Sequence, residues 1–379
     1  MKVLQIHNAY LEPGGEDGVV ARERALLVAR GHEVLPIEYQ NPDSPRAQAQ
    51  GLALSNWNPA SSRRIKEVLE REAVDVTHVH NTWYTASPSA VSAAHRAAPV
   101  VATLHNYRRV CLNSYLYRDN APCLDCVGRM PWKGVIRRCY RDSVGASVAI
   151  GLATSVNRVA RTLDRSIDRF LVLSDFAAEL TEQSGVSADR ITRHDNFVPD
   201  PGPRLSDVTE SATVLAIGRL SPEKGFVELV EAWNRGGPEG LRLMVVGDGV
   251  ERERLEALAG PSVDIVGRKS AEDVSSLMRT SRALLFPSRW FEGQPLVLLE
   301  ALAAGLPIVS SDHPPLREII EGGSQHICED GDWVSALGIT AEESWLRTAS
   351  QAARVRYETR YTPDVAGDRL EEIYRSVRG

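Results

Sequence analysis

The sequence predicts an α/β protein made of two doubly wound domains. At 379 residues the chain exceeds the size at which a single hydrophobic core keeps growing. Short apolar runs alternate with helical patterns along its length, which is typical of parallel strands joined by helices. The alternation restarts after residues 198–204, which hold three prolines and one glycine. We therefore expect a Rossmann-like domain on each side of this stretch.

The first half alternates in the order that a parallel sheet requires. A strand over 3–7 is followed by a glycine-containing loop over 12–16 and a helix over 18–29. Each further strand is an apolar run that ends near a polar residue. We expect these strands over 31–37, 74–80, 99–105, 169–174 and 190–193.

The second half repeats the pattern and closes with an amphipathic helix over 364–378. Its expected strands are 213–218, 241–247, 263–267, 283–287 and 307–310. The predicted domains are 1–198 with an insertion over about 106–141, a linker 199–212, a second domain 213–362 and a terminal helix 363–379. For the helix over 143–160 we favour core packing over a membrane-surface role.

Charge and composition exclude several classes of protein. A net charge of −6 gives no general attraction to nucleic acid. No apolar run reaches about 18 residues, and the N-terminus enters a strand without the pattern of a signal peptide. Five cysteines, an odd number, suit a reducing compartment. We expect a cytoplasmic protein with at most a peripheral contact to the inner membrane face.

Two carboxylates, Glu292 and Glu300, flank an apolar run that reads as the start of a helix, with Pro295 at its first position. Eight helical positions span about 12 Å. The acid and base of glycoside hydrolases lie about 5–9.5 Å apart. This spacing favours two contacts with the ends of one long ligand over a hydrolase pair.

Arg219 and Lys224 lie five residues apart in a turn between a strand and a helix. Two cations in such a turn suit a diphosphate, although a solvated turn with ordinary surface cations is the alternative. Gly247-Asp248-Gly249 and Gly267-Arg268-Lys269 are further strand exits that suit a nucleotide pocket. No Gly-x-Gly-x-x-Gly follows the first strand, which disfavours a nicotinamide dehydrogenase.

Together these motifs resemble glycosyltransferase family 4. The set is Gly-Arg-Leu-x-x-Glu-Lys-Gly from Gly218, then Gly-Asp-Gly, then Glu-Gly-x-Pro-Leu-Val-x-Leu-Glu-Ala from Glu292. The resemblance implies a GT-B fold, with two Rossmann-like domains facing a cleft and the C-terminal helix crossing back to the first domain. It also implies retaining transfer of a sugar from a nucleotide-diphosphate donor, held by the second domain, to an acceptor hydroxyl, held by the first.

The resemblance assigns roles residue by residue. Arg219 and Lys224 would hold the diphosphate, Glu292 would contact the donor sugar and Glu300 the ribose. His105 would act in the cleft, either as a base or by positioning the sugar. Further donor contacts would come from the glycine loop, the exit at Arg268 and the backbone after Glu292, namely Gly14, Gly15, Arg268, Gly293, Gln294, Pro295 and Leu296.

Four cysteines in the insertion have the spacing of a metal site: Cys111, Cys123, Cys126 and Cys139. A Cys-x2-Cys pair with two outer cysteines favours a structural zinc with four thiolates; reduced cysteines or a transient disulfide are the alternatives. From Thr103 to Arg141 the chain carries eight Lys/Arg against two Asp. This basic excess suits an anionic or lipid-linked acceptor, or is simply a solvated face.

The leading prediction is a glycosyltransferase that needs no cofactor for catalysis. The donor is a nucleotide sugar, with UDP favoured over GDP on family prevalence alone. The alternatives are a GT-B epimerase or phosphorylase and a non-catalytic sugar-nucleotide-binding protein. The sequence does not specify the acceptor.

Overall fold

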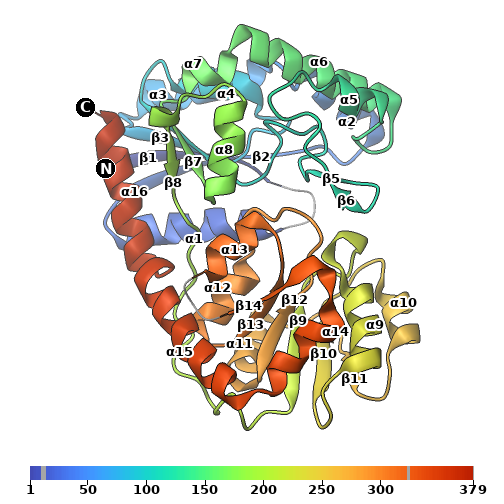
Figure 1. Ribbon diagram of the computed structural model, residues 1–379. Helices are drawn as coiled ribbons and strands as arrows, with labels where there is room; N and C mark the ends of the chain where they lie inside the picture. The colour runs from blue at the N-terminus through green and yellow to red at the C-terminus, as the bar shows by residue number, and fades with distance from the viewer. Residues whose placement is uncertain (10–13, 322–324, 379) are drawn as a thin grey trace. The chain divides into compact units, whose positions relative to one another are not determined.

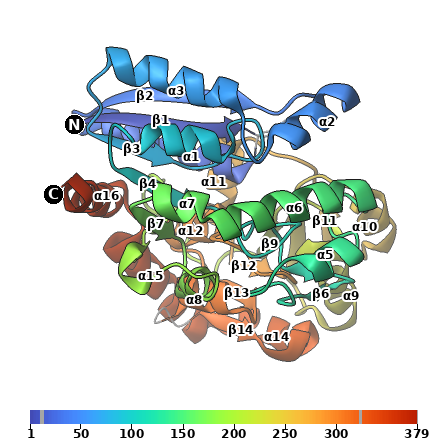
Figure 2. The same cartoon turned by 90° about the horizontal axis from the view of Figure 1, so that it is seen from above.

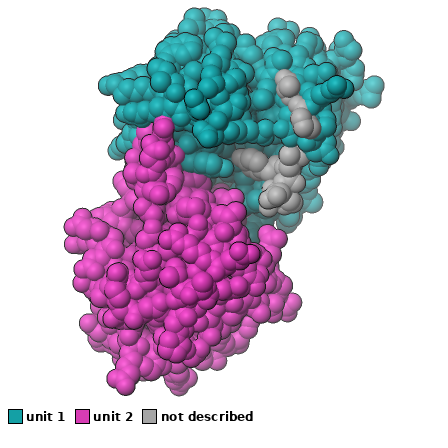
Figure 3. All heavy atoms as spheres, turned by 90° about the vertical axis from the view of Figure 1, so that its right-hand side faces the viewer, with its two compact units in different colours: residues 1–116, 124–195, 366–379 teal, residues 117–123, 196–365 magenta. Residues whose placement is uncertain are grey.

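The computed structural model describes residues 1–9, 14–321 and 325–378. The chain forms two compact units (Figure 3). Unit 1 comprises residues 1–116, 124–195 and 366–379, and unit 2 comprises 117–123 and 196–365. Each unit contains a six-stranded, all-parallel sheet (Figure 1). The predicted α/β fold with two Rossmann-like domains is therefore confirmed.

The sheet of unit 1 has the strand order β2-β1-β3-β4-β7-β8. Helices cover both faces, because the strand side chains are apolar on each side and all of them need burial. The strands are β1 (Lys2–Ala9), β2 (Glu33–Gln40), β3 (Val76–Val79), β4 (Val100–Leu104), β7 (Arg169–Val172) and β8 (Ile191–Arg193). The helices are α1 (Gly15–Ala29), α2 (Pro45–Leu54), α3 (Pro59–Arg71), α4 (Ser87–Ala94), α5 (Trp132–Ile136), α6 (Val144–Ala160), α7 (Thr162–Ser166) and α8 (Asp175–Gln183).

The final helix, α16 (Pro363–Arg378), packs on the sheet of unit 1. Its apolar residues Leu370, Ile373 and Tyr374 are buried against β1, β3, β4, β7 and Leu27 of α1. Arg30, the C-cap residue of α1, forms ion pairs with Glu371, at 2.8 Å, and with Asp368. The helix thus covers a sheet whose last strand ends 170 residues before the helix begins.

The sheet of unit 2 has the order β11-β10-β9-β12-β13-β14. Its last strand was not among the strands predicted from the sequence. The strands are β9 (Thr213–Ile217), β10 (Arg242–Val246), β11 (Val263–Ile265), β12 (Ala283–Phe286), β13 (Ile308–Ser311) and β14 (His326–Cys328). The helices are α9 (Phe226–Gly236), α10 (Arg252–Leu258), α11 (Ala271–Thr280), α12 (Leu296–Ala303), α13 (Pro314–Ile320), α14 (Trp333–Leu337) and α15 (Glu343–Arg360).

The stretch predicted as a linker, 199–212, is packed on unit 2. The Arg204 guanidinium donates hydrogen bonds to the carbonyl oxygens of Ser281 at 2.6 Å and Met278 at 3.2 Å. Burial lowers the pKa of Arg204 to about 10. Val208 lies in the unit 2 core. This part of unit 2 therefore begins at residue 196. The proline-containing segment is packed against unit 2.

The cysteine-containing insertion is divided between the units. Tyr117–Cys123, which includes the short hairpin of β5 (Tyr117–Arg118) and β6 (Ala121–Pro122), belongs to unit 2. The remainder of the insertion belongs to unit 1. The helix expected to pack in a core, α6, lies instead on the outside of unit 1 beside α5 (Figures 1 and 2).

In unit 2 the turns after β9 and β10 approach so closely that a side chain is excluded. A Cβ atom at Gly247 would lie 1.8 Å from the carbonyl oxygen of Gly218, and one at Gly249 would lie 2.3 Å from that of Leu220. The Leu220 N–H donates to the Asp248 carbonyl at 2.9 Å. Gly247 and Gly249 are thus needed for the close packing of these two turns.

We expect Gly247→Ala to destabilise unit 2 by roughly 3 kcal/mol or more, because the backbone of one turn must move. Gly338→Ala is the matched control, since a Cβ there would meet nothing within 4 Å and φ is −55°; it should be neutral or stabilising by about 0.5 kcal/mol. Denaturant unfolding of both variants measures the difference. A loss below about 1 kcal/mol for Gly247→Ala would contradict this account.

Candidate active site

The central feature of unit 2 is an ion pair between Lys224 and Glu292. Lys224 ends a short 3-10 turn, Pro222–Lys224, after β9, and Glu292 lies in the loop between β12 and α12. Nζ of Lys224 is 2.5 Å from Oε1 of Glu292, and the two side chains are 16% and 8% exposed. Adjacent parallel strands deliver their following loops to one edge of the sheet, which brings these residues together although 68 positions separate them.

The loop that carries Glu292 is held by buried polar contacts. Ser288 is fully buried and its hydroxyl donates to Oε1 of Glu292 at 2.7 Å. The side-chain oxygen of Gln294 accepts a hydrogen bond from the backbone N–H of Asn196 at 2.5 Å. The predicted donor contact Gln294 is therefore used to anchor its loop. Sequence reasoning missed Ser288 and Asn196, which have no motif of their own.

Helix α12 begins at Leu296, and Pro295 is its N-cap residue. The prediction that Pro295 occupies the first helical position was wrong by one residue, because its ψ of 122° is extended. The Leu298 N–H donates to the Pro295 carbonyl at 3.1 Å, whereas the N–H groups of Leu296 and Val297 precede any helical acceptor and form an anion-binding edge at the loop end of the sheet. Gly293 lies in the loop before this edge, and Glu300 lies within the helix.

The two predicted cations have different surroundings. The ammonium of Lys224 lies 5.2 Å from the ring centroid of Trp290 and 6.0 Å from that of Phe286. The guanidinium side chain of Arg219 is 61% exposed and pairs with Glu223 at 3.2 Å, within its own turn. Lys224 is thus fixed in place, whereas Arg219 is presented to solvent. Arg268, the third predicted donor contact with a charge, is also exposed.

In unit 1 the predicted glycine loop lies only partly within the described residues, which omit 10–13. Gly14 caps α1, and its N–H donates to the Asp17 carboxylate at 2.7 Å. A Cβ atom at Gly15 would meet no described residue within 4 Å. Asp17 also contacts Nε2 of His7 on β1 at 2.8 Å. Among the described residues, the packing around Gly15 would therefore tolerate a side chain.

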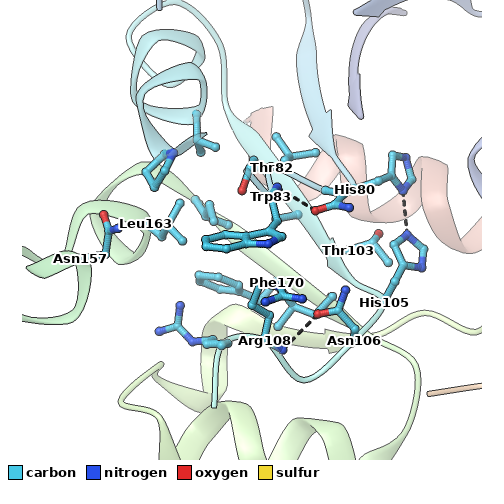
Figure 4. A pocket seen from close by; sticks show the side chains of 18 of the residues that line it. His80, Thr82, Trp83, Thr103, His105, Asn106, Arg108, Asn157, Leu163 and Phe170 are labelled. Atoms are coloured by element: carbon cyan, nitrogen blue, oxygen red, sulfur yellow. Dashed lines mark hydrogen bonds between the residues drawn. The ribbon is translucent and has the colours of Figure 1, made fainter. Parts of the chain in front are cut away.

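His105, just after β4, ends a chain of hydrogen bonds that begins at Arg24. Nε of Arg24 donates to Oε1 of Gln5 at 2.9 Å. Nε2 of Gln5 lies 3.3 Å from the Val20 carbonyl and 3.4 Å from Nε2 of His80. Nδ1 of His80 lies 3.0 Å from Nε2 of His105 (Figure 4).

This chain assigns the ring protons. Arginine only donates, so Gln5 directs its oxygen to Arg24 and its NH₂ group to His80. Nε2 of His80 then accepts, its Nδ1 carries the proton, and Nε2 of His105 accepts in turn. Burial, followed by the neighbouring His80, lowers the pKa of His105 well below its usual value. His105 is therefore neutral near pH 7 and carries its proton on Nδ1.

Behind this chain lies a buried carboxylate, Glu23. Its Oε1 is 2.8 Å from Nδ1 of His78 and 3.1 Å from Nε2 of His80, without hydrogen-bond geometry to either ring. Burial alone would raise the pKa of Glu23, but His78 and His80 lower it well below its usual value. Nδ1 of His78 also contacts the Tyr374 hydroxyl of α16 at 2.8 Å. We interpret this enclosed network as structural.

Glu23, His78 and His80 form the one group of possible metal ligands found in the described part of the chain, with ligand atoms within 4.8 Å of one another. Cys111, Cys126 and Cys139 of unit 1 do not form such a group among the described residues. Burial raises the pKa of the Cys111 thiol, to which the nearby Cys126 contributes. These three sulfurs therefore do not all lie within 4.8 Å of one another, and Cys123 belongs to unit 2, so the structural zinc stays a prediction from the cysteine spacing.

A cavity of about 180 Å³ opens beside His105 in unit 1 (Figure 4). Aromatic and aliphatic side chains line it, including Trp83, Phe170 and Leu163. Its polar lining includes Asn106 and Arg108, and the Arg108 guanidinium lies 4.7 Å from the Trp83 ring. Polar side chains also line it on the opposite side, at Asn157 (Figure 4), so the cavity suits a ligand that has both apolar and polar portions.

Two parallel-sheet Rossmann-like units, one with a Lys–Glu pair at its loop edge, are the architecture of GT-B glycosyltransferases. The comparisons with known proteins agree. The family model described as glycosyltransferase family 4 matches residues 13–200, and that described as glycosyl transferases group 1 matches residues 204–360. Together the two matches span nearly the whole chain, with a glycosyltransferase family 4 domain in its first half and a group 1 glycosyl transferase domain in its second.

Individual relatives are similar along their full length. Phosphatidyl-myo-inositol mannosyltransferase from Mycobacterium leprae is 26% identical over 391 residues, covering 96% of this chain and 94% of the relative. Among solved structures, sucrose-phosphate synthase from Thermosynechococcus elongatus has a TM-score of 0.70 at 16% identity, covering 99% of this chain and 98% of the other. Anabaena HepE in complex with UDP and glucose has a TM-score of 0.66 at 17% identity, covering 99% and 100%.

The buried histidines should make unit 1 sensitive to acid. Burial lowers the pKa of both His80 and His194 to about 4. Between pH 6.5 and 4 the unfolded chain binds protons that the folded chain does not, so stability falls as the pH falls through this window. Each histidine contributes a loss of about 3 kcal/mol when the window is crossed.

Native-state hydrogen exchange of the β3 and β4 amides at pH 7 and pH 5 measures the part of this loss that falls above pH 5. His194→Gln should reduce the pH dependence of the opening free energy, whereas the control His95→Gln, at an exposed histidine, should leave it unchanged. An identical pH dependence in the His194→Gln variant would contradict the assignment.

Proposed function

We propose that the protein is a retaining glycosyltransferase that moves a hexose from a nucleoside-diphosphate sugar to an acceptor hydroxyl. The observation that carries the proposal is the Lys224–Glu292 pair, held at 2.5 Å beside the first turn of α12. Cleavage of a sugar–diphosphate bond places negative charge on the leaving group. A fixed cation next to free N–H groups stabilises this charge without reorganisation.

In this proposal each charged residue has one task. Lys224 and the N–H groups at α12 bind the diphosphate, and the exposed Arg219 joins them when the donor arrives. Glu292 accepts hydrogen bonds from donor-sugar hydroxyls, and Ser288 keeps its carboxylate in place. Glu300 lies on α12 where it contacts the ribose. The acceptor proton passes to a phosphate oxygen of the leaving group on the same face of the sugar.

His105 acts in the proposal as a hydrogen-bond donor. Its Nε2 is occupied by His80, so only the Nδ1–H is free to meet a substrate oxygen. A neutral donor positions a sugar hydroxyl and cannot accept the acceptor proton through the same nitrogen. Of the two roles open from the sequence, the positioning role is therefore the one we propose.

The comparisons inform the substrates. The relative from M. leprae is named for mannosyl transfer and for a phosphatidyl-inositol, and the HepE structure contains UDP. We propose a nucleoside-diphosphate hexose as donor, to be identified among UDP and GDP sugars, and an acceptor with an apolar portion that fits the cavity of unit 1. No metal takes part in the proposed step, because Lys224 and Arg219 supply the positive charge.

A donor panel tests the proposal. One nucleotide sugar should be turned over with release of nucleoside diphosphate, and NMR of the product should show the anomeric configuration of the donor. Glu292→Gln and Lys224→Met should each lower kcat/KM by about 100-fold or more. The matched control Glu231→Gln, at an exposed position on α9, should retain full activity.

An inverted product would refute the retaining mechanism. Full activity of the Glu292→Gln variant would show that Glu292 has no role in the reaction. If several nucleotide sugars bound and none was turned over with any acceptor, the protein would instead be a sugar-nucleotide-binding protein.

We propose separately, on the basis of the cysteine spacing, that the four cysteines of the insertion bind a structural zinc. It predicts about one zinc per chain by metal analysis of protein purified without chelator, and loss of the metal in Cys126→Ser. The isolated cysteine Cys328, buried in unit 2, provides the control variant Cys328→Ser, which should keep its zinc. Well under one zinc per chain would refute the site.

A further inference from the structure

The outward face of α6 carries an uninterrupted aliphatic stripe. Its residues recur every three or four positions and therefore lie on one side of the helix. They are between 37% and 74% exposed: Val144, Val148, Leu152, Val156 and Val159. The residues that α6 buries against unit 1 are mostly small: Ser147, Ile150, Gly151 and Ala153. Most surface helices show the reverse arrangement, with polar side chains outward.

The outward face of α6 also lacks charge. Its one charged residue, Arg158, turns its guanidinium inward to the carbonyl oxygens of Arg109, at 2.6 Å, and Arg129. The surface helix α3, of similar length, exposes charged residues that include Arg63, Lys66 and Glu67. Exposure of α6 to water alone therefore does not account for its sequence.

The segment that contains the stripe is rich in cations. Residues 124–161 contain seven Lys/Arg and two Asp, a net charge of +5 in a chain of net charge −6. The exposed cations are Arg129, Lys133, Arg137, Arg138, Arg141 and Arg161. Helix α5 packs beside α6, with Gly151 so close to Val135 that a Cβ atom would lie 2.4 Å from its methyl group. On α5, Trp132 and Ile136 are 45% and 80% exposed.

We propose that the outward faces of α5 and α6 bind an anionic lipid bilayer. A helix with an aliphatic face lies in the boundary between headgroups and acyl chains, and flanking cations attract anionic headgroups. Exposed tryptophan favours the same boundary. A second copy of the chain is a poor occupant, because pairing this surface with itself would juxtapose two patches of charge +5.

The opposite side of α6 lines the cavity beside His105, through Ala153, Thr154, Asn157 and Arg158. One helix therefore separates the lipid surface from the cavity. This arrangement suits an acceptor whose hydrocarbon chains remain in the bilayer while its head enters the cavity. The acceptor class rests on the proposed function, whereas membrane binding does not.

Sedimentation with vesicles tests the binding without any donor or turnover. The full chain should sediment with phosphatidylglycerol-containing vesicles at least tenfold more than with pure phosphatidylcholine, and 500 mM NaCl should weaken this binding. The variant Val148→Glu/Leu152→Glu should lose at least tenfold in binding. The control Val355→Glu, at a 57% exposed valine of α15, should bind like the parent protein. Circular dichroism and donor hydrolysis confirm that both variants are folded.

Equal binding of the double variant and the parent protein, or no binding to anionic vesicles, would overturn the proposal. A dimer in solution that the double variant separates, or an acidic protein partner that competes with vesicles, would also overturn it in favour of a protein interface. Donor hydrolysis that persists without vesicle binding would leave the proposed transferase function intact, which separates the two failures.

Discussion

The structure depends on one constraint of parallel sheets, namely that every strand leaves its sheet at the same edge. In unit 2 this constraint brings the turn after β9 and the loop after β12 together, and it places Lys224 against Glu292. In unit 1 it gathers the residues that follow β1, β3 and β4, including His80 and His105. Neither site is built within a single segment. Each forms where several loops come together, and the hydrogen bonds between the strands hold those loops in position.

Burial then determines what these residues can do. A carboxylate removed from water needs a compensating charge or donor, and Glu292 finds both in Lys224 and Ser288. A histidine removed from water remains neutral, so the Arg24–Gln5–His80 chain can fix which nitrogen of His105 carries the proton. The chemistry proposed for each residue follows from its partners more than from its type.

Much of this organisation was predictable. The apolar strands, their helical crossovers and the motifs around Glu292 and Gly218 are local patterns. Eleven of the twelve sheet strands overlap a predicted run, although β1, β2 and β13 extend beyond theirs, and only β14 was not predicted. The histidine chain was not predictable, because its members come from β1, α1, β3 and the residues after β4 and no spacing relates them. It was not predictable either that the aliphatic side of α6 faces outward. Its period identifies a helix with an aliphatic side but does not indicate whether that side faces a core.

The contribution of α16 to unit 1 has a consequence for biosynthesis. Tyr374 completes the burial of His78, and Leu370 covers β1, yet both residues are made after all of unit 2. On the ribosome, the unit encoded first is therefore the last to be completed. Until α16 has been made and has left the ribosome, the central sheet of unit 1 has one uncovered apolar flank, which makes the newly made unit 1 a natural client for a chaperone.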